Sequence, residues 1–276
     1  MPELPEVETT RRGIAPALEG RQIKELRVRE RRLRWPIPEG LEDILRGQTV
    51  LGVTRRAKYL LLEIADGCAM VHLGMSGSMR IVPADEQPEK HDHFDIVTVD
   101  EVSGRSEIVR YNDPRRFGSL LWTGAQPNTH PLLCKLGPEP LDDAFNGDRL
   151  WESARGRKVS IKQHIMNNHV VVGVGNIYAS EALFRAGINP KRAAGKISRA
   201  RLQRLTMAIK DVLQEAIKVG GTTLRDYRGG DGKPGYFRQQ LNVYERAEKP
   251  CRICSQPVTR IVQGQRATYY CKQCQH

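Results

Sequence analysis

Four cysteines near the C-terminus constrain the fold of this chain more than any other feature. Cys251 and Cys254 form one C-x2-C pair, Cys271 and Cys274 form a second, and sixteen residues separate the pairs. Two such pairs supply four thiolates for one tetrahedral zinc ion, and the stretch between them is long enough for a β-hairpin. Disulfide bonds or free thiols are the alternatives, but the regular spacing favours zinc. Because four protein ligands leave no position for a substrate, we expect one structural Zn²⁺ per chain.

The charge of the chain predicts a polyanionic partner. Its 44 Lys and Arg residues exceed its 32 Asp and Glu residues, which gives a formal net charge of +12. Nucleic acid is favoured over a membrane as that partner. The sequence has no apolar run of about 18 residues and no signal-peptide pattern, so we expect a soluble, intracellular protein without membrane contact. In that reducing compartment Cys68 and Cys134 are expected to remain thiols within hydrophobic cores.

The residue pattern changes along the chain and predicts an α+β multidomain protein. Residues 1–130 contain short β-type runs separated by Gly, Pro or Asp, which predicts a β-sandwich or flattened barrel behind a short N-terminal helix. Residues 131–148 are rich in Pro, Gly and Asp and are expected to be a linker. A helical domain over 149–247 and a zinc finger over 248–276 complete the expected organisation.

Two segments of the helical domain carry helix signals. In residues 198–221 apolar side chains recur every three or four positions, and a serine and a glycine at the ends can act as caps. A second helix is expected to begin with Asn176 as its N-cap and to stop at Gly187. Residues 228–237 contain four glycines and are expected to form a flexible loop.

Two features of the C-terminal half are suited to binding phosphate. Gly173 and Gly175 permit a tight turn before the helix at Asn176, and a helix N-terminus offers free N–H groups to an anion. The alternative is an ordinary tight turn between helices. Arg266 lies near the tip of the expected zinc hairpin, where it either contacts DNA or remains a solvated loop arginine. We favour the DNA contact.

Two loops of the N-terminal domain carry side chains suited to filling a gap in DNA. Arg115 and Phe117 follow a turn set by Asp113, and Met75 lies in a loop flanked by glycines. Apolar and basic side chains of this kind occupy the space left when a base is extruded. The alternatives are a surface cation, an aromatic at the edge of the core and, for Met75, a core methionine, which the sequence alone favours.

The opening PELPEVE has two interpretations. It can be a helix start, with Pro5 at the first helical position and Glu6 in the first turn. It can also be catalytic if Met1 is removed, because the secondary amine of Pro2 then titrates near the α-amino range of about 7.7 to 8.0. Such an amine attacks an aldehyde-like carbon and forms an imine, and Glu3 would stand beside it as a proton carrier.

Eight motifs along the chain point to one family. In order they are PELPEVE, RRAKYL, HLGMSG, DPRRFG, VVGVGNIYASE, GGTTLRDY, DGKPGYF and the four-cysteine finger. In this order, and over the whole chain, they resemble the formamidopyrimidine-DNA glycosylase family. The resemblance implies a base-excision repair enzyme, both glycosylase and AP lyase, that excises oxidised purines such as 8-oxoguanine and formamidopyrimidines from double-stranded DNA. It also implies an N-terminal β-sandwich, a helix-two-turn-helix domain and a zinc finger.

The resemblance further assigns roles to residues of this sequence. Pro2 is implied to attack C1′ of the damaged nucleotide and form a Schiff base, Glu3 to move protons at the sugar, and Glu6 to hold the amine in place. The residues implied to grip phosphates or otherwise bind DNA are Lys58, His91, Arg115, Lys158, Asn176 and Arg266, with Lys58 and Arg266 also implied in catalysis. The implied wedge is Met75, Arg115 and Phe117, and Tyr236 matches a position near the extruded base. Strand cleavage is implied to proceed by β,δ-elimination.

Two alternatives to this function remain at the level of sequence. The sister branch, which resembles endonuclease VIII and acts on oxidised pyrimidines, more often begins PEGPE. The other alternative is a non-catalytic zinc-finger DNA-binding protein, which retention of Met1 would favour because an amide nitrogen at Pro2 is not nucleophilic. The chain departs from the family pattern at Gln163, His164 and Asn167, where proline, an aromatic residue and an acid are more usual.

Overall fold

The computed structural model describes residues 2–221 and 237–276, which form two compact units. Unit 1 comprises residues 1–134 and 219–236, and unit 2 comprises residues 135–218 and 237–276. Tyr236 and all but the last residue of the expected loop at 228–237 lie outside the described part of the chain. None of the helices in that part combines the length and the apolar character needed to span a bilayer.

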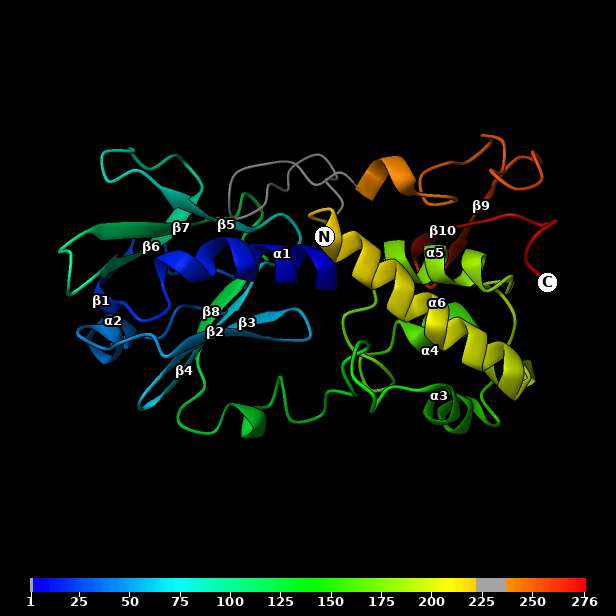
Figure 1. The fold of residues 1–276 in the computed structure, drawn as a ribbon, viewed down its shortest axis with the longest axis horizontal. Helices are drawn as coiled ribbons and strands as arrows, with labels where there is room; N and C mark the ends of the chain where they lie inside the picture. The colour runs from blue at the N-terminus through cyan, green and yellow to red at the C-terminus, as the bar shows by residue number, and fades with distance from the viewer. Residues whose placement is uncertain (1, 222–236) are drawn as a thin grey trace. The chain divides into compact units, whose positions relative to one another are not determined.

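Unit 1 is built from two antiparallel four-stranded sheets, in the orders β1-β6-β7-β5 and β2-β3-β4-β8 (Figure 1). The strands are β1 (Gln22–Val28), β2 (Gly52–Arg56), β3 (Tyr59–Ile64), β4 (Gly67–His72), β5 (Ser78–Val82), β6 (Asp92–Val99), β7 (Ser106–Asn112) and β8 (Ser119–Trp122). One hydrophobic core takes buried side chains from both sheets, including the stacked rings of Phe94 and Tyr111, whose centroids are 4.7 Å apart. The expected β-sandwich is confirmed.

Helix α1 (Leu4–Ile14) contacts strands of both sheets. Glu3 is its N-cap, so the helix begins one residue before Pro5, and the expectation that Pro5 takes the first helical position is wrong by one residue. Val7 and Ile14 are buried in the core that the sheets share. The N-terminal residues are therefore held against the sandwich by an ordinary amphipathic helix.

Helices dominate unit 2. They are α3 (Gly147–Ala154), α4 (Ile161–Ile165), α5 (Asn176–Arg185) and α6 (Arg199–Lys218), with the short elements η3 (Ala194–Lys196) and η4 (Phe237–Gln240). The short elements of unit 1 are α2 (Leu41–Leu45), η1 (Ala15–Ala17) and η2 (Pro127–Thr129). Helices α3 and α5 pack against α6, whose apolar residues are buried at the expected spacing (Figure 1). The N-cap of α5 is Gly175, and Asn176 is the first helical residue, so the expected cap was one residue late.

The expected zinc hairpin is also present in unit 2. Strand β9 (Thr259–Gln263) pairs antiparallel with β10 (Arg266–Tyr270), and β10 lies beside α5 (Figure 1). Of the two cysteines outside this region, Cys68 is buried as expected. Cys134 is exposed, at the boundary between the two units, and its expected core position is wrong.

Candidate functional site

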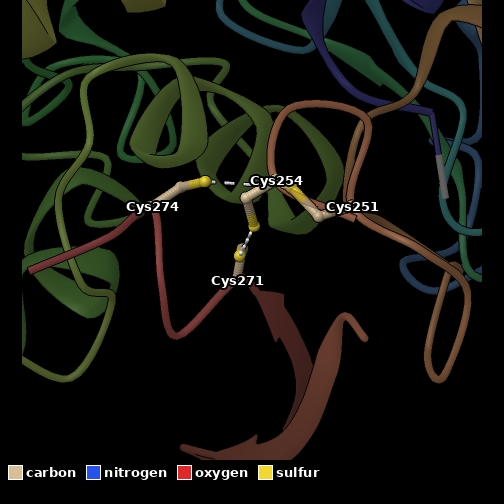
Figure 2. A group of neighbouring side chains, drawn as sticks. All are labelled: Cys251, Cys254, Cys271 and Cys274. Atoms are coloured by element: carbon tan, nitrogen blue, oxygen red, sulfur yellow. Dashed lines mark hydrogen bonds between the residues drawn. The ribbon is translucent and has the colours of Figure 1, made fainter. Parts of the chain in front are cut away.

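The four cysteines of the finger come together as one ligand set (Figure 2). Their sulfur atoms all lie within 4.8 Å of one another. Cys251 and Cys274 are 3.9 Å apart, and Cys254 and Cys271 are 3.4 Å apart. Zinc–sulfur bonds of about 2.3 Å in a tetrahedron place neighbouring sulfur atoms about 3.8 Å apart, so the spacing fits zinc. The four thiolates hold one structural Zn²⁺.

Hydrogen bonds stabilise one thiolate of this cluster. Burial raises the pKa of the Cys251 thiol, but the N–H groups of Cys254 and Ile253 and the thiols of Cys271 and Cys254 together outweigh burial and bring the pKa to about 7. The buried Gln275 accepts the N–H of Cys271 at 2.8 Å and donates to the carbonyl of Ile188 at 2.9 Å. The finger is thereby tied to the end of the helix–turn segment that follows α5.

The N-terminus of α1 gathers three residues that the family resemblance assigns to the reaction. Pro2, Glu3 and Glu6 are all buried in unit 1. Glu6 accepts the N–H of Glu3 at 2.8 Å, the reciprocal contact of a capping box. Gly221, with φ of +79°, lies against Glu6, because an added Cβ would stand 3.1 Å from its Oε1. This contact could not be predicted, since nothing in a Gly-Gly pair identifies its neighbour.

Glu8 connects α1 to the turn that precedes Lys58. Its carboxylate accepts hydrogen bonds from Arg11 at 3.1 and 3.0 Å and from Arg55 at 3.3 Å. Burial raises the pKa of Glu8, but the surrounding guanidinium groups outweigh burial and lower it overall. Arg55 also donates to the carbonyl of Ala57 at 2.9 Å, at a position with φ of +54°. The backbone next to Lys58 is therefore fixed relative to α1.

Lys58 lies in a cationic environment with His72. Burial, together with the charges of Lys58 and Arg34, lowers the pKa of His72 to about 4, and the charge of Asp113 opposes them only in part. The neutral ring uses Nδ1 to accept the N–H of Gly74 at 3.0 Å, directly before Met75. The Lys58 turn and the Met75 loop are thus neighbours, and His72 is a further residue of this region that its strand pattern did not reveal.

Acidification from about pH 7 to about pH 5 is expected to destabilise the region around His72 by about 1 to 2 kcal/mol. Because folding lowers the pKa of His72 from 6.5 to about 4, the unfolded state binds more protons over that interval. The free energy of unfolding is therefore highest above the pKa that His72 has in the unfolded state, and it falls as the pH drops toward the folded-state pKa. Hydrogen exchange of β4 and the Gly74 amide, corrected for the intrinsic rate, measures this. His72→Asn keeps an uncharged acceptor and should remove most of the dependence; an equal dependence in both proteins would contradict the assignment.

The two loops that carry the expected wedge residues touch each other. Phe117 is 43% exposed and Met75 is 40% exposed, so the core position that the sequence favoured for Met75 is wrong. The Arg115 guanidinium stands 4.7 Å from the centre of the Phe117 ring. An added Cβ on Gly74 would lie 2.5 Å from the carbonyl carbon of Phe117, so the two loops touch through their backbones. Large apolar groups exposed on paired loops are available to a ligand.

In unit 2 the zinc hairpin brings Asn176 and Arg266 together. Asn176 donates to the carbonyl of Ala267 at 3.0 Å, and its Oδ1 accepts from Lys162 at 2.6 Å. Lys162 is 2% exposed and also donates to the hydroxyl of Thr268 at 2.8 Å. Arg266, the residue before Ala267, is exposed. Lys162 was missed in the sequence because a lysine in a short helix ordinarily faces solvent.

The departures from the family pattern before this turn have local roles. The Oε1 of Gln163 accepts from Ser160 at 2.7 Å, and its Nε2 would stand 2.8 Å from a Cβ added to Gly264 at the hairpin tip. The buried His164 forms a 3.0 Å hydrogen bond with Ser153 of α3. A cavity of about 220 Å³ beneath the hairpin tip is lined by Lys162, Gln163, Met166, Gln263, Gly264 and Arg266.

The remaining DNA-binding candidates divide between the two units. His91 is partly buried in unit 1, and its carbonyl accepts the N–H of Asp113 at 3.0 Å. This bond joins His91 to the segment that carries Arg115. Lys158 is exposed in the turn between α3 and α4 of unit 2. Each unit therefore presents its own group of basic side chains.

Comparison with known proteins accounts for nearly the whole chain. Residues 1–120 match the "Formamidopyrimidine-DNA glycosylase N-terminal domain", residues 136–228 the "Formamidopyrimidine-DNA glycosylase H2TH domain", and residues 248–276 the "Zinc finger found in FPG and IleRS". The chain is 56% identical over 275 residues to the formamidopyrimidine-DNA glycosylase of Methylococcus capsulatus, with 100% of both chains covered.

Solved structures agree with this match. The MutM (FPG) protein of Thermus thermophilus superposes with a TM-score of 0.87 at 37% identity, covering 99% of this chain and 98% of the other. A Lactococcus lactis FPG mutant in complex with Fapy-dG containing DNA gives a TM-score of 0.90 at 32% identity, covering 99% of both chains.

Together the fold, the cysteine cluster and these matches define a zinc-finger DNA glycosylase with a helix-two-turn-helix domain. The chain belongs to the formamidopyrimidine-DNA glycosylase family. It is therefore a base-excision repair enzyme with both glycosylase and lyase activity.

Proposed function

We propose that this enzyme excises oxidised purines through the N-terminal amine of Pro2, once Met1 has been removed. The observation that carries the proposal is the burial of Pro2 beside the carboxylates of Glu3 and Glu6 at the start of α1. A secondary amine there is partly unprotonated at neutral pH, whereas a lysine at about 10.4 is almost fully charged. Glu6 holds the backbone of Glu3, which fixes the direction of the amine.

In the first step the Pro2 nitrogen forms a bond to C1′ of the damaged nucleotide. The bond between C1′ and the base breaks, the base leaves with a proton, and opening of the sugar gives an iminium. Glu3 carries the proton at the ring oxygen of the sugar. The positive nitrogen then acidifies the C2′ proton, so the 3′ phosphate leaves by β-elimination, and a second elimination releases the 5′ phosphate. Since four cysteines complete the zinc coordination, the metal stabilises the finger and has no position for substrate.

The basic residues of each unit bind the DNA backbone around the lesion. Lys58 in unit 1 and Asn176 with Arg266 in unit 2 are proposed to grip the flanking phosphates, and Lys58 and Arg266 assist the reaction there. His91, Arg115 and Lys158 add further DNA contacts. The Asn176 amide donates to the carbonyl of Ala267 at 3.0 Å and to the hydroxyl of Tyr244 at 3.5 Å, and a phosphate oxygen is proposed to replace the longer of these two contacts.

The wedge residues Met75, Arg115 and Phe117 are proposed to fill the space that the extruded nucleotide leaves. A base inside a duplex shields its sugar carbon, and extrusion costs a few kcal/mol that contacts in the vacated space offset. All three side chains are exposed, and the two loops of unit 1 that carry them touch each other, as this role needs. Tyr236 is proposed to lie near the extruded base; it falls outside the described residues.

Oxidised purines are proposed over oxidised pyrimidines as substrates. The opening PELPEVE supports this choice, and the structural relative from Lactococcus lactis was crystallised with a Fapy-dG lesion. The full-length match to glycosylases disfavours the non-catalytic alternative. We place this activity in the cytoplasm at the nucleoid, where the substrate lies, and expect the enzyme to act as a monomer.

Borohydride trapping on duplexes with a single lesion tests the proposal. Reduction converts the iminium into a stable amine, so an adduct on a peptide that begins at Pro2, strongest with 8-oxoguanine, is the expected result. Matched undamaged and oxidised-pyrimidine duplexes are the controls. A stronger adduct on the pyrimidine lesion would move the enzyme to the sister branch. Zinc-loaded protein that lacks Met1 and forms no adduct on any duplex would overturn the proposed chemistry.

A further inference from the structure

The buried carboxylate of Asp113 is shared by the two loops that carry the wedge. Asp113 is 0% exposed. Its Oδ1 accepts from the hydroxyl of Ser76 at 2.8 Å and from the N–H of Arg115 at 3.2 Å. Its Oδ2 accepts from the N–H of Gly118 at 2.9 Å and from the hydroxyl of Tyr111 at 3.2 Å. Ser76 follows Met75, whereas Arg115 and Gly118 enclose Phe117, so one side chain bonds to both loops.

The two loops pack closely against each other beside this carboxylate. A Cβ added to Gly118 would lie 1.8 Å from the Tyr111 hydroxyl and 2.4 Å from the carbonyl of His72. A Cβ added to Gly74 would lie 2.5 Å from the carbonyl carbon of Phe117. Glycine permits this approach of the backbones, and the Tyr111 hydroxyl at the contact is itself a donor to Asp113.

We propose that Asp113 is a positioning residue that locks the Met75 loop and the Arg115–Phe117 loop into one preassembled wedge. The inference rests on the proposed wedge role of Met75, Arg115 and Phe117. A wedge that is ordered before DNA arrives loses less conformational entropy on insertion, so more of its contact energy supports extrusion of the lesion. The backbone of Asp113 extends the same unit, because its N–H donates to His91 and its carbonyl accepts from His93 at 2.7 Å.

A carboxylate suits this position because two of its four partners, the N–H groups of Arg115 and Gly118, can only donate, and each meets a different carboxylate oxygen. Asparagine has nearly the same shape but replaces one oxygen with an NH₂ group, which is itself a donor. In one orientation that group opposes the N–H of Gly118, and in the other it opposes the N–H of Arg115. Asp113→Asn therefore keeps the volume of the side chain but breaks a hydrogen bond to the loop that carries Phe117.

The test compares duplex and single-stranded substrates for Asp113→Asn. Excision of 8-oxoguanine from a duplex needs the wedge and is expected to fall about tenfold to a hundredfold. Cleavage at an abasic site in a single strand has no vacated space to fill and should stay within about twofold of wild type. The fluorescence change of 2-aminopurine placed opposite the lesion, which reports wedge insertion, should shrink with excision. Asp100→Asn is the matched control, because the half-buried Asp100 likewise accepts two backbone N–H groups, at 3.0 and 2.8 Å, and should change neither activity.

A double-mutant cycle separates the possible failures. If Asp113 acts through the wedge, Asp113→Asn should lower the rate of duplex excision by a smaller factor in the Phe117→Ala background than in the wild type. Additive losses, equal losses on both substrates, or an unchanged duplex rate would overturn the inference. Wild type that fails to cleave the single strand would instead refute the Pro2 chemistry, and an unaffected Phe117→Ala variant would refute the wedge. If Asp113→Asn does not fold, Ser76→Ala removes one donor alone and should give the same selective loss at a few-fold scale.

Discussion

Replacing Pro2 with glycine is expected to slow base release and strand cleavage about a thousandfold. Glycine keeps an N-terminal amine but loses the ring that makes this amine secondary and holds its direction. The buried carboxylates of Glu3 and Glu6 then face a mobile group, and the nitrogen rarely reaches C1′. Single-turnover rates on an 8-oxoguanine duplex measure the loss, and borohydride trapping measures the imine separately.

Affinity separates a catalytic loss from a structural one. Pro2→Gly should bind a duplex with a stable abasic-site analogue as tightly as wild type, because the phosphate-binding side chains are unchanged. Pro36→Gly, at an exposed proline, makes the same substitution away from the site and should leave both rates unchanged. Mass spectrometry must show that Met1 is absent from each protein. Full activity in Pro2→Gly would remove Pro2 from the mechanism.

Structure that depends on local sequence was predictable. The helix expected within 198–221 forms as α6, because its apolar residues recur at helical spacing and its terminal glycine adopts φ of +79° at Gly220. The hairpin and the four-thiolate cluster follow from the spacing of the cysteines, which is a local property of the sequence. The exact start of α5 was not predictable, since both Gly175 and Asn176 are suitable N-caps.

Contacts between distant residues were not predictable. The ammonium of Lys162 is buried among acceptors from distant parts of the chain, namely Asn176 at 2.6 Å and Thr268, 106 positions later, at 2.8 Å. Asp113 was recognised as a turn residue, but its bond to Ser76 spans 37 positions and depends on how two strands bring their loops together. The chemistry of an N-terminal secondary amine made Pro2 a candidate, and the order of the motifs favoured that interpretation over an ordinary helix start. The networks that hold such residues come from tertiary packing.

Cys271→Ser is expected to abolish stoichiometric zinc and to weaken DNA binding about a hundredfold. A hydroxyl is a poor zinc ligand, and structural zinc in isolated finger peptides contributes about 10 to 16 kcal/mol. Cys271 directly follows β10, so loss of the metal also releases Arg266 and the carbonyl of Ala267. Lys162 then loses partners within the protein, which leaves a buried ammonium incompletely compensated.

The control for this prediction is Cys134→Ser, the same substitution at an exposed cysteine outside the cluster. It should keep full zinc and normal affinity. Zinc content by atomic absorption and binding to an abasic-analogue duplex give the two readouts for each protein. Because the Pro2 region belongs to unit 1 and the finger to unit 2, cleavage of a saturating single-stranded abasic substrate should fall less than affinity. Full zinc with normal affinity in Cys271→Ser would mean that three thiolates suffice and that the hairpin does not depend on the fourth.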